Sequence, residues 1–111
     1  MSERVGWRRV CAVGDLVPDR GRAALVDDEQ VAVFLLADTG RVHAVAHLDP
    51  FSGANVMARG LVGTRGERPT VASPMHKQVF DLRTGECLDD PTVRLRVWPA
   101  RVTDGWVEVR P

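Results

Sequence analysis

The sequence predicts an all-β fold with little helix, a small antiparallel barrel or sandwich, and two observations lead to this prediction. Turn-forming groups recur at short intervals between segments rich in Val, Leu and aromatic residues, which is typical of antiparallel strands. These groups are Asp27-Asp28-Glu29, Asp38-Thr39-Gly40, Thr84-Gly85 and Asp104-Gly105. No window of about a dozen residues combines a helical period with caps, and only residues 53–59 leave room for a short helical turn.

The apolar pattern assigns different environments to individual strands. Residues 30–36 are apolar on both alternating faces, which predicts a central strand in the core. Residues 93–97 alternate strictly between aliphatic and Arg side chains, which predicts a half-buried strand. Residues 102–109 contain Asp-Gly between two β-rich runs and predict a closing hairpin. By the same alternation we expect His43 to face solvent from its strand.

Length and composition indicate one soluble domain that spans residues 1–111. The chain has 111 residues, of which 44% are hydrophobic and 27% charged, as in ordinary folded domains. Fifteen basic residues balance fifteen acidic ones, so no overall field attracts nucleic acid or an anionic membrane. Residues 1–7 lack the apolar core of a signal peptide, and no run reaches the length of a membrane helix. We expect a cytoplasmic protein with neither nucleic acid nor membrane as partner.

Catalysis by this chain alone is not expected. The sequence has no nucleophile with an identifiable base, no Gly-rich phosphate loop and no dinucleotide fingerprint. Its two cysteines, Cys11 and Cys87, are too few and too distant for a disulfide scaffold or a Cys-x-x-Cys metal site. We expect both to be buried free thiols.

Two loops carry an unusual density of Pro, Gly and functional side chains, at residues 47–55 and 73–77. Such loops often hold the site of a protein. In a Rieske domain the corresponding loops read Cys-x-His followed by Gly, and then Cys-x-x-His leading into a Phe-Asp-Leu-x-Thr-Gly hairpin. Here residues 80–85 resemble that hairpin, Ser73-Pro74-Met75-His76 stands in place of the second motif and Asp49-Pro50-Phe51 in place of the first. The frame resembles a Rieske domain.

The cluster ligands of a Rieske domain are missing from this frame. A Rieske cluster needs two thiolates and two imidazoles, whereas the four positions here hold Asp49, Phe51, Ser73 and His76. Only His76 could still serve, so we expect no cluster and no other cofactor or metal on this chain. An alternative is a free-standing Rieske-type electron carrier with unconventional ligation, in which His47, Asp49 and His76 form a mixed nitrogen and oxygen site.

A more specific resemblance extends from Trp7 to Val109. It is carried by residues 49–56, 59–63, 73–78 and 84–91, which together resemble the small subunits of assimilatory NAD(P)H-dependent nitrite reductases. That family is Rieske-like in fold and lacks the cluster ligands. The resemblance implies an accessory, non-catalytic subunit whose partner is a large subunit with siroheme, a 4Fe-4S cluster, FAD and the NAD(P)H site, which reduces nitrite to ammonium.

The loop tips are the predicted partner-binding surface. Two prolines lock φ and lower the entropy cost of docking, and an aromatic ring or a flexible thioether could anchor a partner. Alternatively, Phe51 and Met75 fill the volume that a cluster would occupy, because interiors are close-packed. A third alternative is a binding module for an unrelated protein. The predicted partner-binding residues are Pro50, Phe51, Pro74, Met75, His76 and Lys77.

Overall fold

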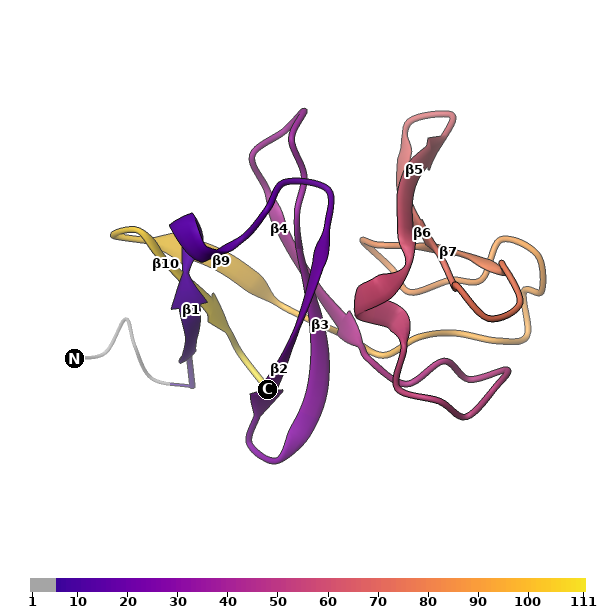
Figure 1. Cartoon of the computed structure of the whole chain (residues 1–111), viewed down its shortest axis with the longest axis horizontal. Coiled ribbons are helices and arrows are strands. Elements are labelled where there is room, and N and C mark those ends of the chain that lie inside the picture. Colours follow the sequence, from indigo (N-terminus) through magenta and orange to yellow (C-terminus); the bar gives the residue numbers. More distant parts are fainter. Residues whose placement is uncertain (1–5) are drawn as a thin grey trace.

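A computed structural model describes residues 6–111 of the chain; residues 1–5, which include most of the segment tested for a signal peptide, lie outside the described residues. Three antiparallel sheets stand side by side (Figure 1). Within the described residues, the helical elements are two short 3-10 turns, η2 (Val13–Asp15) and η3 (Met57–Arg59). The all-β fold with little helix is therefore confirmed, and η3 occupies the end of the expected turn at residues 53–59.

The central sheet has the order β2-β3-β4-β8. Its strands are β2 (Gly21–Val26), β3 (Glu29–Leu35), β4 (Val42–Ala46) and β8 (Val97–Trp98). The turn between β2 and β3 was predicted from Asp27-Asp28-Glu29, and both aspartates have positive φ there. This conformation matches the twist of two-residue hairpins.

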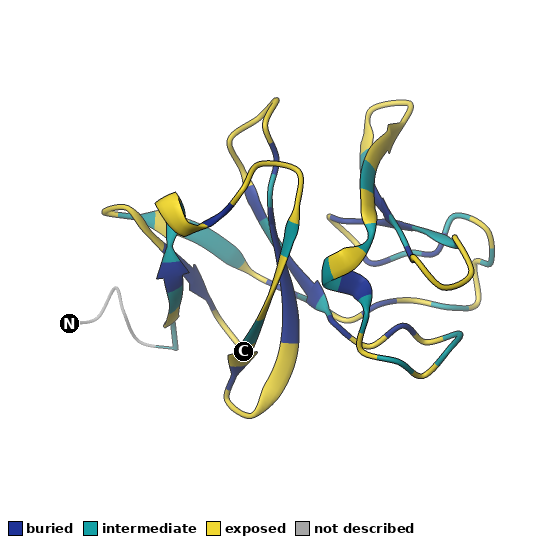
Figure 2. Cartoon of the chain, in the orientation of Figure 1, coloured by how far each residue is buried: buried dark blue, intermediate teal, exposed yellow. Residues whose placement is uncertain are grey.

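Strand β3 divides the hydrophobic core into two clusters. Val31 and Val33 point into the first cluster, which also contains Trp98. Ala32 and Phe34 point into the second, so β3 is buried on both faces (Figure 2). The predicted central strand is confirmed, and its two-sided apolar character has a specific cause: each face packs against a different part of the molecule.

A second sheet has the order β1-β10-β9 and carries the chain end. Its strands are β1 (Arg8–Ala12), β9 (Ala100–Thr103) and β10 (Trp106–Val109). The hairpin between β9 and β10 turns at Asp104 and Gly105, whose φ values are 53° and 79°. Both residues take the positive φ that this tight turn requires, so the predicted closing hairpin is confirmed.

The third sheet supports the two loops that resemble the Rieske loops. It contains β5 (Leu61–Arg65), β6 (Arg68–Ala72) and β7 (Val79–Asp81) in that order. One loop, residues 73–78, joins β6 to β7, while the other, residues 47–56, leads from the end of β4 towards this sheet. The sheet lies on the right in Figure 1.

The predicted strand at residues 93–97 is wrong for most of its length, because β8 includes only its last residue. Upstream of β8 the backbone bonds to a turn instead of a ladder: the Leu95 N–H donates to the Gly85 carbonyl at 2.7 Å, and Arg94 forms an isolated bridge with Glu86. The alternation nevertheless governs burial, since Leu95 is buried and Arg94 exposed.

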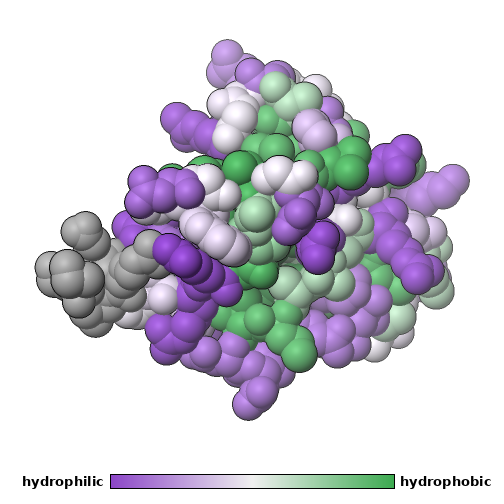
Figure 3. Space-filling view, turned by 60° about the vertical axis from the view of Figure 1, so that its left-hand side comes forward, coloured by the Kyte–Doolittle hydropathy of each residue, from purple (hydrophilic) through white to green (hydrophobic). Residues whose placement is uncertain are grey.

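The surface mixes hydrophilic and hydrophobic side chains, and the face in Figure 3 shows apolar surface between polar groups. Single exposed apolar residues are normal in soluble proteins. Two of them, Leu48 and Met75, lie in the loops that resemble the Rieske loops. The other large exposed apolar side chains among the described residues are Val17, Leu25, Leu61, Val102 and Trp106. In the described residues, no helix is long and apolar enough to span a membrane.

Two glycines with the same φ of 79° allow a matched test of backbone packing. A Cβ on Gly85 would collide with the Leu95 carbonyl, whereas one on Gly105 would meet nothing within 4 Å. We expect Gly105→Ala to lower the free energy of unfolding by about 1 kcal/mol through φ strain alone, and Gly85→Ala by about 3 kcal/mol because the clash adds to that strain. Urea denaturation measures both; equal losses would contradict the packing argument.

Candidate functional site at the tips of the two loops

The two loops are joined by a buried hydrogen bond between Asp49 and Ser73. The Ser73 hydroxyl donates to Oδ2 of Asp49 at 2.5 Å. Both side chains are almost completely buried, although the two residues stand 24 positions apart in sequence. The structure therefore brings together two of the four residues at the degenerate ligand positions, and these two bind each other.

The Asp49 carboxylate is also held by its own loop. Its Oδ1 accepts the Phe51 N–H at 2.9 Å, and Ser52 donates further hydrogen bonds. Burial acts to raise the pKa of this carboxyl, but the hydrogen bonds from Ser73, Phe51 and Ser52 outweigh it and hold the pKa below its usual value. Asp49 is therefore a buried, ionised and hydrogen-bonded group at neutral pH.

Each loop closes on itself with the same backbone pattern. In the first, the Asp49 carbonyl accepts the Gly53 N–H and the Asp49 N–H donates to the Ala54 carbonyl, both at 2.8 Å. In the second, Ser73 makes the equivalent bonds with Lys77 and Gln78, both at 2.9 Å. The Ser73 hydroxyl also accepts the Met75 N–H at 3.2 Å. Each loop is thus closed by its own backbone hydrogen bonds, and the Asp49–Ser73 bond joins the two loops.

The predicted docking residues differ in exposure. Phe51 is partly buried, and its ring lies against Phe80 with centroids 6.1 Å apart at an interplanar angle of 48°. This placement agrees with the space-filling alternative for Phe51, because the ring packs on the second core cluster. Met75 is 52% exposed and fills no interior volume. The other four residues, Pro50, Pro74, His76 and Lys77, are also exposed.

His47 has a structural role at the base of the first loop. Its side chain is buried, and Nδ1 accepts the Ala58 N–H at 3.1 Å. Its carbonyl accepts the N–H groups of Val56 and Met57, both at 3.0 Å. Burial first, and then the charge of Arg59, lower the pKa of the imidazole, which favours the neutral form that can accept a hydrogen bond.

The expectation that His43 faces solvent is wrong, because its side chain is half-buried. It lies in β4 beside the turn that follows β7, and its ring N–H donates to the Leu82 carbonyl. Strand alternation alone could not predict this, since the covering turn comes from a distant part of the sequence. Cys11 and Cys87 are buried free thiols as expected.

The residues present do not fit a Rieske cluster. The two cysteines of the sequence lie in different core clusters and outside both loops. At the thiolate positions, Asp49 and Ser73 use their side chains to bind each other, and Phe51 offers no donor atom. The mixed-ligand alternative also loses support, because Asp49 and His47 are both engaged in hydrogen bonds. Among residues 6–111, no group of three or more His, Cys, Asp or Glu side chains is arranged to hold a metal ion.

Comparison with known proteins identifies the family of this chain. Residues 6–110 match the model of the Rieske-like [2Fe-2S] domain. The chain is 38% identical over 104 residues to the nitrite reductase (NADH) small subunit of Escherichia coli K12, and the match covers 94% of this chain and 96% of that one. The chain belongs to the Rieske-like family of nitrite reductase small subunits. It resembles the crystal structure of the Mycobacterium tuberculosis NADH-dependent nitrite reductase small subunit at a TM-score of 0.91 and 54% identity, over 95% and 94% of the two chains.

One further relative of this small-subunit family is a large subunit. The chain is 37% identical over 103 residues to the nitrite reductase [NAD(P)H] large subunit of Klebsiella oxytoca. The match covers 93% of this chain but only 11% of the large subunit. That large subunit therefore contains a segment similar to this whole small subunit.

The sequence did not reveal the partnership of Asp49 and Ser73 in this small subunit. Both residues were identified as degenerate ligand positions, and the resemblance gave no reason to pair them. One usable signal existed: a carboxylate is an acceptor and a hydroxyl is a donor, and the two stand at equivalent positions of loops expected to meet. The role of His47 carried no comparable signal, because its partner Ala58 contributes only a backbone N–H.

Ser73→Ala tests the bond between the loops. The substitution removes a hydroxyl donor from a buried carboxylate, so we expect the free energy of unfolding at pH 7 to fall by about 2 kcal/mol. Thr84→Ala is the control, because its hydroxyl accepts the Glu86 N–H in an exposed turn, and its loss should cost less than about 1 kcal/mol. Urea denaturation gives both values; equal, small losses would show that the buried bond contributes little.

The pH dependence of stability tests the ionised state of Asp49. Its pKa in the folded chain lies below the ordinary value of 3.8, so its contribution is complete above that value and is lost as pH falls through the folded-state pKa. We expect the difference in free energy of unfolding between the wild type and Asp49→Asn to stay constant from neutral pH to about pH 5 and to shrink below about pH 4. A difference that persists unchanged to pH 2 would contradict this assignment.

Proposed function

We propose that this chain is the accessory, non-catalytic small subunit of a cytoplasmic NAD(P)H-dependent nitrite reductase and that it carries no cluster. The observation that carries the proposal is the Asp49–Ser73 hydrogen bond. The two residues at the thiolate positions of the Rieske frame bind each other and so link the two loops. The four positions do not offer the two thiolates and two imidazoles that hold a Rieske cluster, which argues against electron transfer through this chain. What the frame retains is a rigid pair of loops.

The partner in this proposal is the large subunit, which would hold siroheme, a 4Fe-4S cluster, FAD and the NAD(P)H site and reduce nitrite to ammonium. The relative from Klebsiella oxytoca supports the pairing, because its large subunit contains a segment similar to this chain. A segment joined to the large subunit in one protein is a reasonable binding partner of the large subunit in another.

The proposed contact surface is the loop tips, defined by Pro50, Phe51, Pro74, Met75, His76 and Lys77. Exposed groups of different kinds stand together there, since the apolar Met75 lies next to the imidazole of His76 and the cationic Lys77. Lys77 supports a functional assignment, since its φ is 62° where Gly53 holds the equivalent position of the other loop. A non-glycine residue in this conformation costs about 1 kcal/mol, and such strain is often found at functional sites.

The absence of a cluster has a direct test. We expect the chain, expressed and purified anaerobically and then incubated with iron and sulfide, to contain no stoichiometric iron and to show no visible absorbance, because it lacks the thiolates of a Rieske site. Iron analysis and a visible spectrum measure this. Stoichiometric iron that is lost in His76→Ala would instead support the electron carrier with unconventional ligation.

A substitution at the tip tests the docking surface. We expect Met75→Ser to weaken binding to a co-expressed siroheme-containing large subunit by about tenfold, because an apolar anchor contributes about 1.4 kcal/mol or more. Val17→Ser is the control, since Val17 is 57% exposed and lies in the segment between η2 and β2. Size-exclusion chromatography and calorimetry measure complex formation.

Three outcomes of this binding experiment are distinct. Wild-type chain that elutes separately from the large subunit at micromolar concentrations would overturn the subunit assignment and favour the binding module for another protein. Equal weakening by Met75→Ser and Val17→Ser would place the contact elsewhere. Weakening by Met75→Ser alone would support the loop tips.

A further inference from the structure

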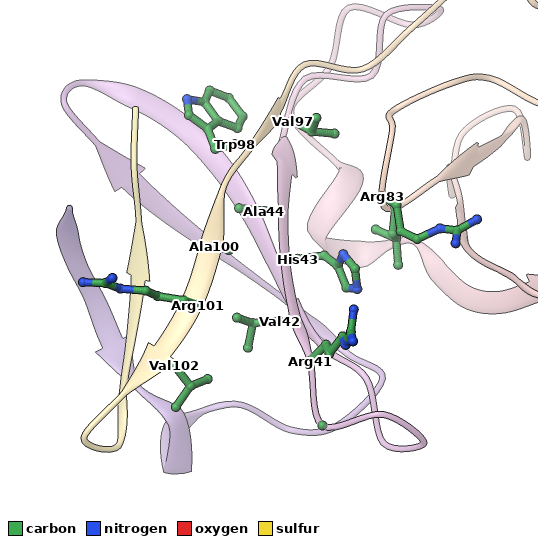
Figure 4. Close-up of a pocket in the computed structure, with 12 residues that line it drawn as sticks. Arg41, Val42, His43, Ala44, Arg83, Val97, Trp98, Ala100, Arg101 and Val102 are labelled. Atoms are coloured by element: carbon green, nitrogen blue, oxygen red, sulfur yellow. The ribbon is translucent and has the colours of Figure 1, made fainter. Parts of the chain in front are cut away.

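A hollow opens at the ends of β4 and β7 that lie opposite the loop tips. Strand β4 begins at this hollow and ends at the loop of residues 47–56. Strand β7 begins after the loop of residues 73–78 and ends at the hollow. The hollow is a cleft of about 390 Å³ between β4, β9 and the turn after β7 (Figure 4). It is a surface separate from the proposed docking site.

The cleft exists because two strand edges diverge. Strand β8 pairs with β4 only at Ala44 and Val45, after which Pro99 carries the chain into β9, which pairs with β10. Figure 4 shows β9 crossing away from β4 as a result. The Ala46 N–H donates to the Arg96 carbonyl on the β8 side. Because N–H direction repeats every two residues in a strand, the Val42 N–H faces this same side, beyond the end of β8.

The lining combines an apolar floor with basic groups. The apolar members are Val42, Ala44, Leu82, Val97, Trp98, Ala100 and Val102. The charged or titratable members are Arg41, His43, Arg83 and Arg101, and none of the carboxylates of residues 6–111 lines the cleft. Arg101 points away from the centre in Figure 4 and bonds Glu108 at 2.9 Å. The ionisable side chains that line this cavity are thus all basic, although the chain as a whole has no net charge.

The pKa of His43 depends on burial and on the charged groups around the cleft. Burial first, and then the guanidinium groups of Arg41 and Arg83, lower the pKa of its imidazole. The carboxylate of Asp81 and the hydrogen bond with Leu82 act in the opposite direction without reversing the shift. Asp81 is itself buried and holds Arg83, with Nε 3.6 Å from Oδ1. Two further carboxylates, Asp38 and Glu67, line the adjacent hollow that shares Arg41, His43 and Arg83.

We propose that this cleft binds a carboxylate carried on an apolar body, with Arg41 and His43 holding the oxygens and the Val42 N–H as a further donor. Figure 4 places the nitrogen atoms of Arg41 beside the His43 ring. A guanidinium group matches a planar carboxylate with two parallel hydrogen bonds, and the apolar floor suits the rest of the ligand. Arg83 extends from the facing turn and is half exposed, so it adds charge at the mouth. The proposal does not depend on the identity of the large subunit.

Nuclear magnetic resonance titration of the full chain tests this site with acetate and benzoate as probes. At constant ionic strength held with chloride, we expect both carboxylates to raise the pKa of His43 saturably, because a bound anion favours the imidazolium. Benzoate should bind more tightly than acetate because it also covers the apolar floor. A pKa of His43 that responds equally to chloride and to both carboxylates would overturn the proposal.

Two variants distinguish benzoate binding at this site from a general effect of positive charge on the protein surface. We expect Arg41→Gln to weaken benzoate binding by about tenfold or more, since hydrogen bonds to charged groups contribute about 1.5 to 3 kcal/mol. Arg22→Gln is the control, because Arg22 is an exposed residue of β2 and does not line the cleft. Folding of each variant is checked by its amide spectrum. Unchanged binding in a folded Arg41→Gln, or equal weakening in both variants, would overturn the proposal.

A peptide arm distinguishes the source of the carboxylate. The peptide acetyl-Val-Glu-Val-Glu-Val-amide is compared with benzoate and with its Lys-containing counterpart. Binding of the Glu peptide at least about tenfold tighter than benzoate, with no binding of the Lys peptide, indicates a carboxylate on a protein chain. Benzoate binding equal to or tighter than the Glu peptide indicates a free small carboxylate. Equal binding of the Glu and Lys peptides, without a benzoate response, would overturn the site.

Discussion

The loop tips depend on the hydrogen bond between Ser73 and Asp49. Burying a carboxylate costs several kcal/mol unless donors satisfy it, and here the donors come from both loops. Each loop can therefore keep its position only while the other is in place. The hydroxyl is the component that makes this dependence mutual, since it donates to Asp49 while it accepts the Met75 N–H of its own loop.

The loops themselves follow a local hydrogen-bond pattern that, among residues 6–111, occurs three times with a polar first residue. In each case the first residue accepts the N–H of the residue four positions later and donates to the carbonyl five positions later, as seen from Asp49, Ser73 and Asp81. In each case a side-chain oxygen of that first residue also accepts the N–H two positions later. The fifth residue has positive φ, and it is Lys77 only in the second loop. Short polar side chains and a fifth residue that accepts positive φ thus determine the local shape of these loops.

This difference between local and tertiary determinants explains how much the sequence could predict. The central strand β3 and the hairpin at Asp104-Gly105 follow from local patterns, because alternation and positive φ need no knowledge of distant residues. The irregular path before β8 and the covering of His43 depend on which distant turn reaches them. The resemblance placed the two loops at one tip, but the pairing of Asp49 with Ser73 is a tertiary contact that neither loop encodes alone.

The two surfaces for which we propose functions contact different residues of the core. The loop tips contact the second cluster through Phe51 and Phe80, whereas the cleft between β4 and β9 is lined by Val42 and Trp98 of the first cluster and by Leu82 of the second. The effects of substitutions on stability are additive when the sites are distant and share no partner. The loop tips and the cleft share no residue. Substitutions at the tip should therefore disturb docking while leaving His43 and Arg41 in place, so the two proposals can succeed or fail independently.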